Sequence, residues 1–522
     1  MSYKFCILAA GKGTRNRAIK GIHKALLPIE NKAAITHILD KIPKSVGIVI
    51  AVGYKSEQIK SYLKITQPDR VITFVDIENH DGKGSGPGLS LLCCEEHLQS
   101  PFIFTSADTI VEESFALGGV KNNWVGFSDV KMSDAATYCL VDGEKYLDRF
   151  YYGSGDRAFI GMAGIYDYKK FWDGLRVKSL IKDEHQVLNG FSDLDNIELK
   201  YFTWHDTGNE KAYACIRDRF CNDVVAMKND EAIFIDNGFV IKYFYDTEIV
   251  DQRISRVEHL NGVCPRVDRV NDNMFCYRLV DGDVLSLIND EAVLNRILPF
   301  WYDTLGDATF KKNDRFLEDC AKMYHDKTHE RCEYFYNSPI DEIEYINGAK
   351  VDTIKNMLEK VDWDEIYCKA IPSRFHGDYQ PENIIYGSDG EFSLIDWRQS
   401  FGDSLKVGDS YYDLGKLYHA LLINGKDVNN KMYKVRTKDN SAYLCYYSRS
   451  NLMYLMGEFK KFCKAKGYSW DNIEMLGTLQ YLGIASLYKD FHNGEYGEFL
   501  FLYGKYLLSK RIKEQQGDTR TY

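Results

Sequence analysis

Several features that mark membrane, nucleic-acid-binding or disulfide-bonded proteins are absent from this 522-residue chain. No stretch approaches about 20 consecutive apolar residues, so we expect no membrane insertion. There is no long basic run and the net charge is −10, so a nucleic-acid partner is not expected. The 13 cysteines contain no C-x-x-C spacing, which fits a reducing, cytoplasmic location.

The overall composition is typical of a soluble globular protein, with 45% hydrophobic and 27% charged residues. The length suggests roughly two to four domains. The apolar run at residues 5–10 is too short for a signal peptide and leads into a glycine-rich loop, so it predicts a buried first strand. The adjacent Cys93 and Cys94 lie in an apolar helical pattern, which predicts buried free thiols.

The first 225 residues alternate between strand and helix patterns. We predict a helix over residues 33–42 and strands at residues 4–10, 46–52, 71–76 and 102–106. This alternation indicates an α/β domain with a mostly parallel sheet. Ligands gather at the carboxyl ends of such strands, and both Gly11 and Asp108 directly follow a predicted strand.

The pattern changes after residue 225, which predicts domains at 1–225 and 226–522. Residues 232–235 and 239–244 read as two antiparallel strands joined at Asp236-Asn237-Gly238, and 275–279 as another strand. From about residue 291 helical patterns dominate, except at 374–398. A small sheet lobe before a helical lobe indicates a bilobal α+β domain. We expect a short connection at 222–231 and a frayed tail at 510–522.

The loop Gly11-Lys12-Gly13-Thr14-Arg15 follows the first predicted strand. Its glycines let the backbone approach a triphosphate, and Lys12 and Arg15 can neutralise phosphate charge. Lys24 is a second candidate for that role. By itself such a loop fits an ordinary strand-to-helix turn equally well.

Two carboxylates strengthen the nucleotide interpretation. Asp108 ends an apolar strand, and Asp206 comes from a distant segment. Convergence of the two on Mg²⁺ would hold a triphosphate and neutralise charge as pyrophosphate leaves. Such chemistry needs alignment and charge stabilisation more than a nucleophile from the protein.

Residues 1 to about 220 resemble nucleoside-triphosphate-dependent nucleotidyltransferases with a Rossmann-like core, which include sugar-1-phosphate nucleotidyltransferases and bacterial phosphocholine cytidylyltransferases. The resemblance implies catalytic roles for Arg15 and Lys24, nucleotide contacts for the glycine-rich loop, and metal binding by Asp108 and Asp206. His23 replaces the family's usual proline. The further matching residues are Gly11, Lys12, Gly13, Gly53, Tyr54, Gly161 and Gly164.

The segment at residues 82–91, which contains Gly86, corresponds to the part of this family that reads the nucleobase. It departs from the asparagine-rich version of phosphocholine enzymes, which puts choline in doubt and leaves the base open. A flexible loop is an equally good interpretation of this segment alone.

A second constellation lies near the C-terminus. Asp378 and Asn383 have the D-x-x-x-x-N spacing of a kinase catalytic loop, and Asp396 ends an apolar run 13 residues later. The first aspartate can orient a substrate hydroxyl and accept its proton. Asn383 and Asp396 can hold Mg²⁺ at the phosphates of ATP.

Residues 228 to about 510 resemble the choline kinase and aminoglycoside phosphotransferase family. The resemblance implies that Lys242 binds ATP with Glu258 as its ion-pair partner, and that His376 and Asp413 support the fold. It covers amino alcohols, sugars and polyols as substrates.

The sequence leaves the substrate pocket open. Six aromatic residues could form a cage for a quaternary ammonium group, although packing of the helical lobe is the commoner role of such residues. Arg398 could pair with an anionic substrate group or with a nearby acid. The six are Tyr411, Tyr412, Tyr446, Tyr447, Trp470 and Tyr488.

These patterns together predict a bifunctional cytoplasmic enzyme. The C-terminal domain would phosphorylate a small hydroxyl-bearing metabolite with ATP and Mg²⁺. The N-terminal domain would then attach a nucleotidyl group, with CTP favoured over other NTPs, for surface glycan or lipid decoration. Alternatives are a non-catalytic kinase-like sensor that regulates the transferase, and a C-terminal domain that inactivates an antibiotic. Channelling and oligomeric state are left open.

Overall fold

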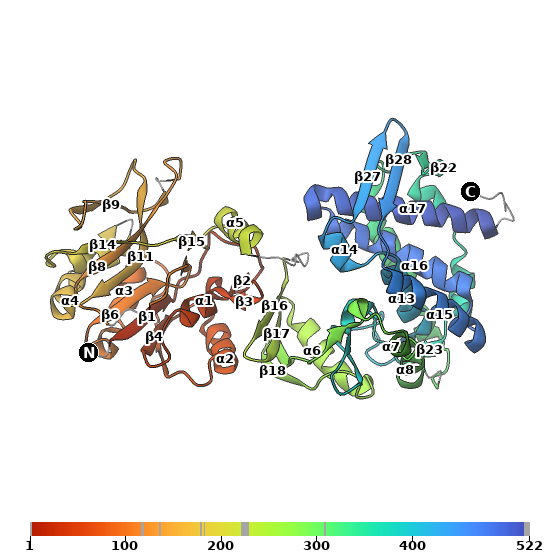
Figure 1. Ribbon diagram of the computed structural model, residues 1–522, viewed down its shortest axis with the longest axis horizontal. Coiled ribbons are helices and arrows are strands. Elements are labelled where there is room, and N and C mark those ends of the chain that lie inside the picture. The colour runs from red at the N-terminus through yellow and green to blue at the C-terminus, as the bar shows by residue number, and fades with distance from the viewer. Residues whose placement is uncertain are drawn as a thin grey trace. The chain divides into compact units, whose positions relative to one another are not determined.

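The computed structural model describes residues 3–115, 119–134, 137–177, 180–181, 183–220, 229–306 and 309–515 (Figure 1). These residues fall into two compact units. The first contains the described residues up to 246 together with 269–276, and the second contains 247–268 and those from 277 onward. Residues 222–228 of the predicted connection at 222–231 lie outside the described residues. The domain boundary between residues 225 and 226 stays a prediction.

A nine-stranded sheet forms the centre of the first unit. Strand β1 (Lys4–Ala9) pairs in parallel with β4 (Gly47–Val52) and β6 (Phe102–Ser106), and β5 (Ile72–Asp76) pairs in parallel with β4. β11 (Arg157–Ile165) runs antiparallel to β6 and extends the sheet. The mostly parallel α/β domain and its four predicted strands are therefore confirmed, and the carboxyl ends of β1, β4 and β6 lie at one edge.

The other elements of this unit connect and cover the sheet. α1 presents Ile35, Ile38 and Leu39 to the core at helical spacing. The expectation that both adjacent cysteines are buried is wrong for Cys93, which is exposed just after α3, whereas Cys94 is buried. The bounds are β2 (Pro28–Ile29), β3 (Lys32–Ala33), α1 (Ala34–Asp40), α2 (Ser56–Thr66), α3 (Pro87–Leu92), β7 (Thr109–Val111), β8 (Trp124–Asp129), β9 (Leu140–Asp142), β10 (Arg149–Tyr151), α4 (Tyr168–Arg176), β12 (Leu180–Ile181), β13 (Glu184–His185), β14 (Glu198–Tyr201), β15 (Trp204–Asp206) and α5 (Glu210–Phe220).

A smaller four-stranded sheet follows, in the order β16-β17-β19-β18. The predicted hairpin is confirmed, with Asn237 and Gly238 at positive φ as its turn requires. Ile241 and Tyr243 on β17 belong to the core formed by the β1–β4 sheet and α1. Side chains alternate along a strand, so Lys242 lies on the opposite face of the hairpin. The bounds are β16 (Glu231–Asp236), β17 (Phe239–Phe244), β18 (Val267–Asn271) and β19 (Met274–Arg278).

The second unit is mainly helical, and its core is built around α13, α16 and α17. The pattern did not predict the hairpin of β27 and β28, which interrupts the helices (Figure 1). The expectation of a frayed tail is wrong for residues 510–515, which continue α17; residues 516–522 lie outside the described part. The bounds are α6 (Thr247–Arg256), β20 (Asp283–Val284), α7 (Glu291–Leu294), α8 (Ile297–Thr304), α9 (Asp314–Ala321), α10 (Lys327–Cys332), β21 (Tyr345–Ile346), β22 (Ala349–Lys350), α11 (Ile354–Leu358), α12 (Trp363–Lys369), β23 (Pro372–Ser373), β24 (Ile384–Tyr386), β25 (Phe392–Leu394), β26 (Gly408–Asp409), α13 (Ser410–Leu422), α14 (Gly425–Asn429), β27 (Tyr433–Lys438), β28 (Ser441–Tyr446), α15 (Ser450–Lys466), α16 (Trp470–Ala485) and α17 (Glu495–Gln515).

Among the described residues, no helix is both long and apolar enough to span a membrane.

The shared core makes a prediction about stability. Replacing the fully buried Ile241 by alanine should destabilise the first unit by about 2–5 kcal/mol, because it leaves a cavity in a core that also contains β4. Calorimetry should show the same transition moving as in Ile50→Ala, a variant of β4 in the same core. The control Ile235→Ala alters a side chain that is 37% exposed in the same hairpin and should change stability little. Separate melting of hairpin and sheet would contradict the shared core.

Candidate functional sites

The glycine-rich loop of the first unit leaves β1 at the edge where the parallel strands end. Gly13 has φ of +62°, and a Cβ atom there would lie 3.0 Å from the side chain of Lys24, so only glycine fits without strain. Lys12 pairs with Asp81 at 2.5 Å, and Arg15 is exposed. The loop therefore presents two cationic side chains beside an uncovered backbone.

Lys24 and Asp108 form the central ion pair of this site, with Nζ and Oδ2 2.8 Å apart. Lys24 opens the short helix η1 (Lys24–Leu26), whose first turn His23 caps by accepting from Ala25 N–H. Asp108 also accepts from the Ser106 hydroxyl. Burial alone would raise the pKa of Asp108, but Lys24 and Ser106 lower it to about 2, so this carboxylate is held ionised.

Asp206 also lies close to Asp108. It ends β15, and the pairing of β15 with β7 sets it opposite Thr109, the residue after Asp108. It accepts hydrogen bonds from Tyr138 Oη at 3.1 Å and from Gly208 N–H at 2.8 Å. Burial and the charge of Asp108 raise the pKa of Asp206. The structure thus brings together the two carboxylates that the sequence placed about 100 residues apart.

The two carboxylates suit a divalent cation. A Cβ atom at Gly208 would lie 2.9 Å from Asp206 Oδ1 and 3.3 Å from Asp108 Oδ2, so both groups face one small space. Two acidic groups with one lysine leave negative charge that an oxygen-binding cation such as Mg²⁺ would balance. The donor set therefore fits the expected metal.

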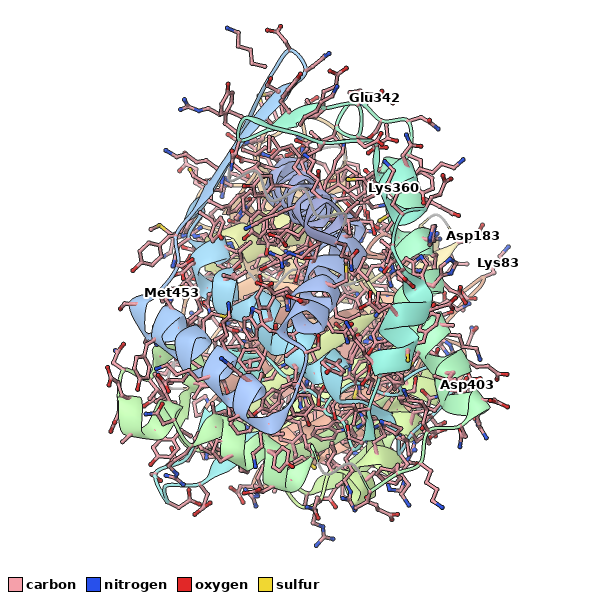
Figure 2. The ribbon with its side chains drawn as sticks, turned by 90° about the vertical axis from the view of Figure 1, so that its right-hand side faces the viewer. Lys83, Asp183, Glu342, Lys360, Asp403 and Met453 are labelled. Atoms are coloured by element: carbon pink, nitrogen blue, oxygen red, sulfur yellow. The ribbon has the colours of Figure 1, made fainter. Side chains whose placement is uncertain are left out.

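The predicted base-reading segment is anchored on the segment around β13. Gly84 N–H donates to Asp183 O at 2.8 Å, and Lys83 lies beside Asp183 with Nζ 3.7 Å from its carboxylate (Figure 2). Gly86 has φ of +124°, and a Cβ atom there would lie 2.8 Å from His185 O. The positive φ of Gly86 and its close packing against His185 thus require glycine at this position. The nucleobase contact stays a prediction.

Asp378 anchors the candidate site of the second unit. Lys416 of α13 lies 3.1 Å from its carboxylate, and Asn383 Nδ2 donates to its backbone oxygen and to Oδ2 at 2.9 Å each. Burial would raise the pKa of Asp378, but Lys416 lowers it, so the group is held as an acceptor. The structure brings Asp378 and Asn383 together as the spacing predicts.

Asp396 has a partner that the sequence reasoning missed. It sits at φ of +58°, and Arg253 Nη1 of α6 lies 2.6 Å from Oδ1. Ile395 N–H donates to Asn383 O at 2.9 Å, which joins the two predicted metal-binding segments. The carboxylate of Asp396 and the amide oxygen of Asn383 are suitable Mg²⁺ ligands, although Arg253 already balances the charge of that carboxylate.

A buried frame holds this catalytic loop. Arg256 of α6 is fully buried and donates to the backbone oxygens of Phe375, His376, Arg398 and Leu405. Burial lowers its pKa to about 9. From the opposite direction, Asp413 accepts from His376 N–H and Gly377 N–H at 2.7 Å each. Arg256 carried no local sequence signal, and the sequence could not pair it with these four oxygens, because each contact spans more than 100 residues.

Two predicted ATP contacts remain as predictions. Lys242 is buried on β17, whereas Glu258 is exposed in the turn η5 (Val257–His259) of the other unit.

Comparison with known proteins identifies part of the chain. Residues 5–116 match the MobA-like NTP transferase domain family, so the N-terminal part contains a nucleotidyltransferase domain. No curated protein matches the sequence.

Three solved structures illustrate the similarity of the N-terminal part. A UDP-glucose pyrophosphorylase from Acinetobacter baumannii is 14% identical, covers 42% of this chain and 93% of its own, and has a TM-score of 0.35. A CTP:phosphocholine cytidylyltransferase from Streptococcus pneumoniae is 17% identical over 42% and 100% of the two chains, with a TM-score of 0.37. HddC from Yersinia pseudotuberculosis is 19% identical over 42% and 100%, with a TM-score of 0.33. No substrate follows from likenesses this low.

The Lys24–Asp108 pair predicts a pH effect. In Lys24→Met the burial of Asp108 is no longer opposed by a positive charge, so its pKa should rise from about 2. The acidic limb of the pH profile for NTP-dependent pyrophosphate release should move upward by at least about one pH unit. Lys20→Met, which removes an exposed lysine from the segment between the glycine-rich loop and Lys24, should leave the limb in place. An unmoved limb in Lys24→Met would show that Lys24 does not control this carboxylate.

The buried frame predicts a stability effect. Arg256→Met removes the Arg256 donor from four backbone oxygens, of which only His376 O keeps a second donor among the described residues, the Arg398 N–H. The change should lower the free energy of unfolding of the second unit by at least about 3 kcal/mol. Arg266→Met, whose side chain is 91% exposed, is the control. Equal denaturant midpoints for the two variants would mean that Arg256 does not hold the loop.

Proposed function

We propose that the chain is a bifunctional enzyme. The second unit phosphorylates a hydroxyl group of a small polar metabolite with ATP. The nucleotidyltransferase domain then links that phosphate to a nucleotide from CTP or another NTP. One observation supports the kinase function: Asp378, Asn383 and Asp396 lie together within one buried frame. Lys416 pairs with Asp378, the proposed catalytic base.

The phosphorylation step uses Asp378 as the acceptor of the substrate's hydroxyl proton. The hydroxyl oxygen forms a bond to the γ-phosphorus of ATP, the bond to the bridging oxygen breaks, and ADP leaves. Lys416 keeps Asp378 ionised and fixes its direction. Asn383 and Asp396 would hold Mg²⁺, which when bound neutralises charge on the ATP phosphates.

The transfer step needs no covalent enzyme intermediate. An oxygen of the new phosphate attacks the α-phosphorus of the NTP, and pyrophosphate leaves with the electrons of the broken bond. Lys12, Arg15 and Lys24 neutralise the phosphates. Asp108 and Asp206 would hold Mg²⁺, which when bound neutralises charge on the triphosphate.

The order of the two steps follows from their chemistry, because the first makes the nucleophile of the second. Joining them on one chain raises the local concentration of the intermediate. An amino alcohol, sugar or polyol would give an NDP-activated group, which we assign to cytoplasmic synthesis of surface glycan or lipid decoration. CTP is the favoured NTP.

One observation favours a second candidate, a kinase-like domain that binds nucleotide and regulates the transferase without turning ATP over. Arg253 already occupies one oxygen of Asp396, so metal binding there must compete with an ion pair.

Two variants separate these functions. Asp378→Ala should reduce ATP-dependent phosphorylation by about 10²–10⁴-fold and leave the transferase active on a phosphorylated compound that is supplied. Asp108→Ala should do the reverse. Asp364→Ala and Asp69→Ala, which alter exposed aspartates of the same two units, are the matched controls. ATP-dependent phosphorylation that survives in Asp378→Ala would refute the role of Asp378 as the base. Absence of ATP turnover in the unaltered chain, with the transferase still active on a supplied phosphorylated compound, would refute the kinase half and favour the sensor.

A further inference from the structure

A small cavity that is open to solvent lies beside Lys416, the ion-pair partner of Asp378, in the second unit. Helices α10, α13 and α16 supply its walls, with Lys327, Tyr412, Lys416 and Gln480 as polar lining. Lys416 contacts the cavity on one side and the carboxylate of Asp378 on the other. A substrate in this cavity therefore lies one side chain away from the proposed base.

Positive charge exceeds negative charge at and around the cavity. Lys327 and Lys416 line it, and Arg398 lies near enough to influence Tyr412 and Lys327. Lys327 donates to Tyr412 Oη at 3.3 Å, and Arg398 Nε donates to Ser400 O at 3.0 Å. Within the described part of the chain, neither Lys327 nor Arg398 has a carboxylate within ion-pair distance, whereas Lys416 is paired with Asp378.

The pKa of Tyr412 reflects the same excess of positive charge. Burial would raise the pKa of Tyr412, but the charges of Lys327, Arg398 and Lys416 lower it to about 8. A half-buried cation without a counterion is costly, and a bound anion removes that cost.

Gln480 adds a hydrogen-bond acceptor to the cavity. Its Nε2 donates to Tyr412 O at 3.2 Å, which fixes the orientation of the amide. Its Oε1 is buried and has no hydrogen-bond partner among the residues that the structure describes. A hydroxyl group of a ligand would satisfy this oxygen.

A quaternary ammonium group does not suit the cavity. Of the six aromatic residues considered for a cage, only Tyr412 is part of the lining described. Lys327 Nζ already lies over its ring, 5.8 Å from the centroid. Others pack elsewhere: Tyr411 contacts Tyr468, and Trp470 contacts Phe459.

We propose that this cavity binds one end of a small hydroxylated anion. Its carboxylate or phosphate group is held by Lys327, with Arg398 nearby, one hydroxyl group bonds to Gln480, and another extends out of the cavity past Lys416 to Asp378. The inference rests on the proposed kinase function and narrows its substrate from amino alcohols, sugars and polyols to acidic hydroxyl compounds. Arg398, which the sequence left between two roles, then pairs with the substrate.

A binding experiment tests the cavity without requiring phosphoryl transfer. Thermal unfolding of the full chain is followed with glycerate, glycerol phosphate, glycerol and choline. We expect one or both acids to raise the midpoint of the second unit, and glycerol and choline to leave it unchanged. The shift should be lost in Lys327→Met, regained in Lys327→Arg, and retained in Lys322→Met, the control for an exposed lysine in the adjoining turn.

The outcomes separate the proposals. A shift by choline, no shift by either acid, or a shift that persists in Lys327→Met would overturn the anion cavity. Response to only one acid would identify the carboxylate or the phosphate as the recognised group. Acid binding without ATP turnover would leave the cavity standing and refute the kinase half of the proposed function.

Kinetics with a turned-over acid give a second test. Lys327→Met should raise KM for the acid about tenfold or more, because one charge-assisted contact is lost, and should leave KM for ATP unchanged. A rise confined to KM for ATP would show that these cations serve the nucleotide phosphates and would overturn the proposal.

Discussion

The constraint on which the rest of the first unit depends is a hydrophobic core shared by two sheets. Ile241 and Tyr243 of the β16–β17 hairpin pack into the same core as β1, β4 and α1. Tyr243 Oη donates to Lys20 O at 2.8 Å, and a Cβ atom at Gly21 would lie 2.5 Å from the Tyr245 ring. The segment that leads to Lys24 is thus packed against the hairpin that carries Lys242. Two candidate nucleotide-binding lysines therefore belong to one packed unit, although the sequence pattern assigns them to different domains.

The two candidate sites use the same electrostatic arrangement. In each, a basic side chain from another segment lies against a buried aspartate: Lys24 on Asp108 and Lys416 on Asp378. In both cases the positive charge outweighs burial, so the pKa of the carboxyl falls. The carboxylates stay ionised near neutral pH, which metal binding and proton acceptance both require.

Local patterns predicted the parts of the structure that depend on neighbours in sequence. The four parallel strands and the Asn237–Gly238 hairpin are read from periodicity and turn chemistry, and the D-x-x-x-x-N spacing placed Asp378 beside Asn383. Charge partners could not be found in this way. Arg253 and Arg256 of α6 meet acceptors more than 100 residues away, and such contacts exist only after the chain has folded.

Packing also determines features that residue type alone does not predict. Gly164 resembles a substrate-side residue in sequence, but a Cβ atom there would lie 2.0 Å from Trp124 Nε1, so close packing alone requires glycine. Cys93 and Cys94 both follow the last residue of α3, yet Cys93 is exposed and Cys94 is buried, a difference that the apolar pattern does not predict.

The most direct test of the two-step account follows phosphorus through both reactions. The full chain would be given ATP labelled at the γ-phosphorus, unlabelled CTP, UTP and GTP, Mg²⁺, and a panel of amino alcohols, sugars, polyols and hydroxy acids. The account predicts an NDP-linked product in which the phosphate next to the metabolite carries the label and the phosphate next to the nucleoside does not. An NDP-linked product that forms without ATP, or label found only in inorganic phosphate, would contradict it.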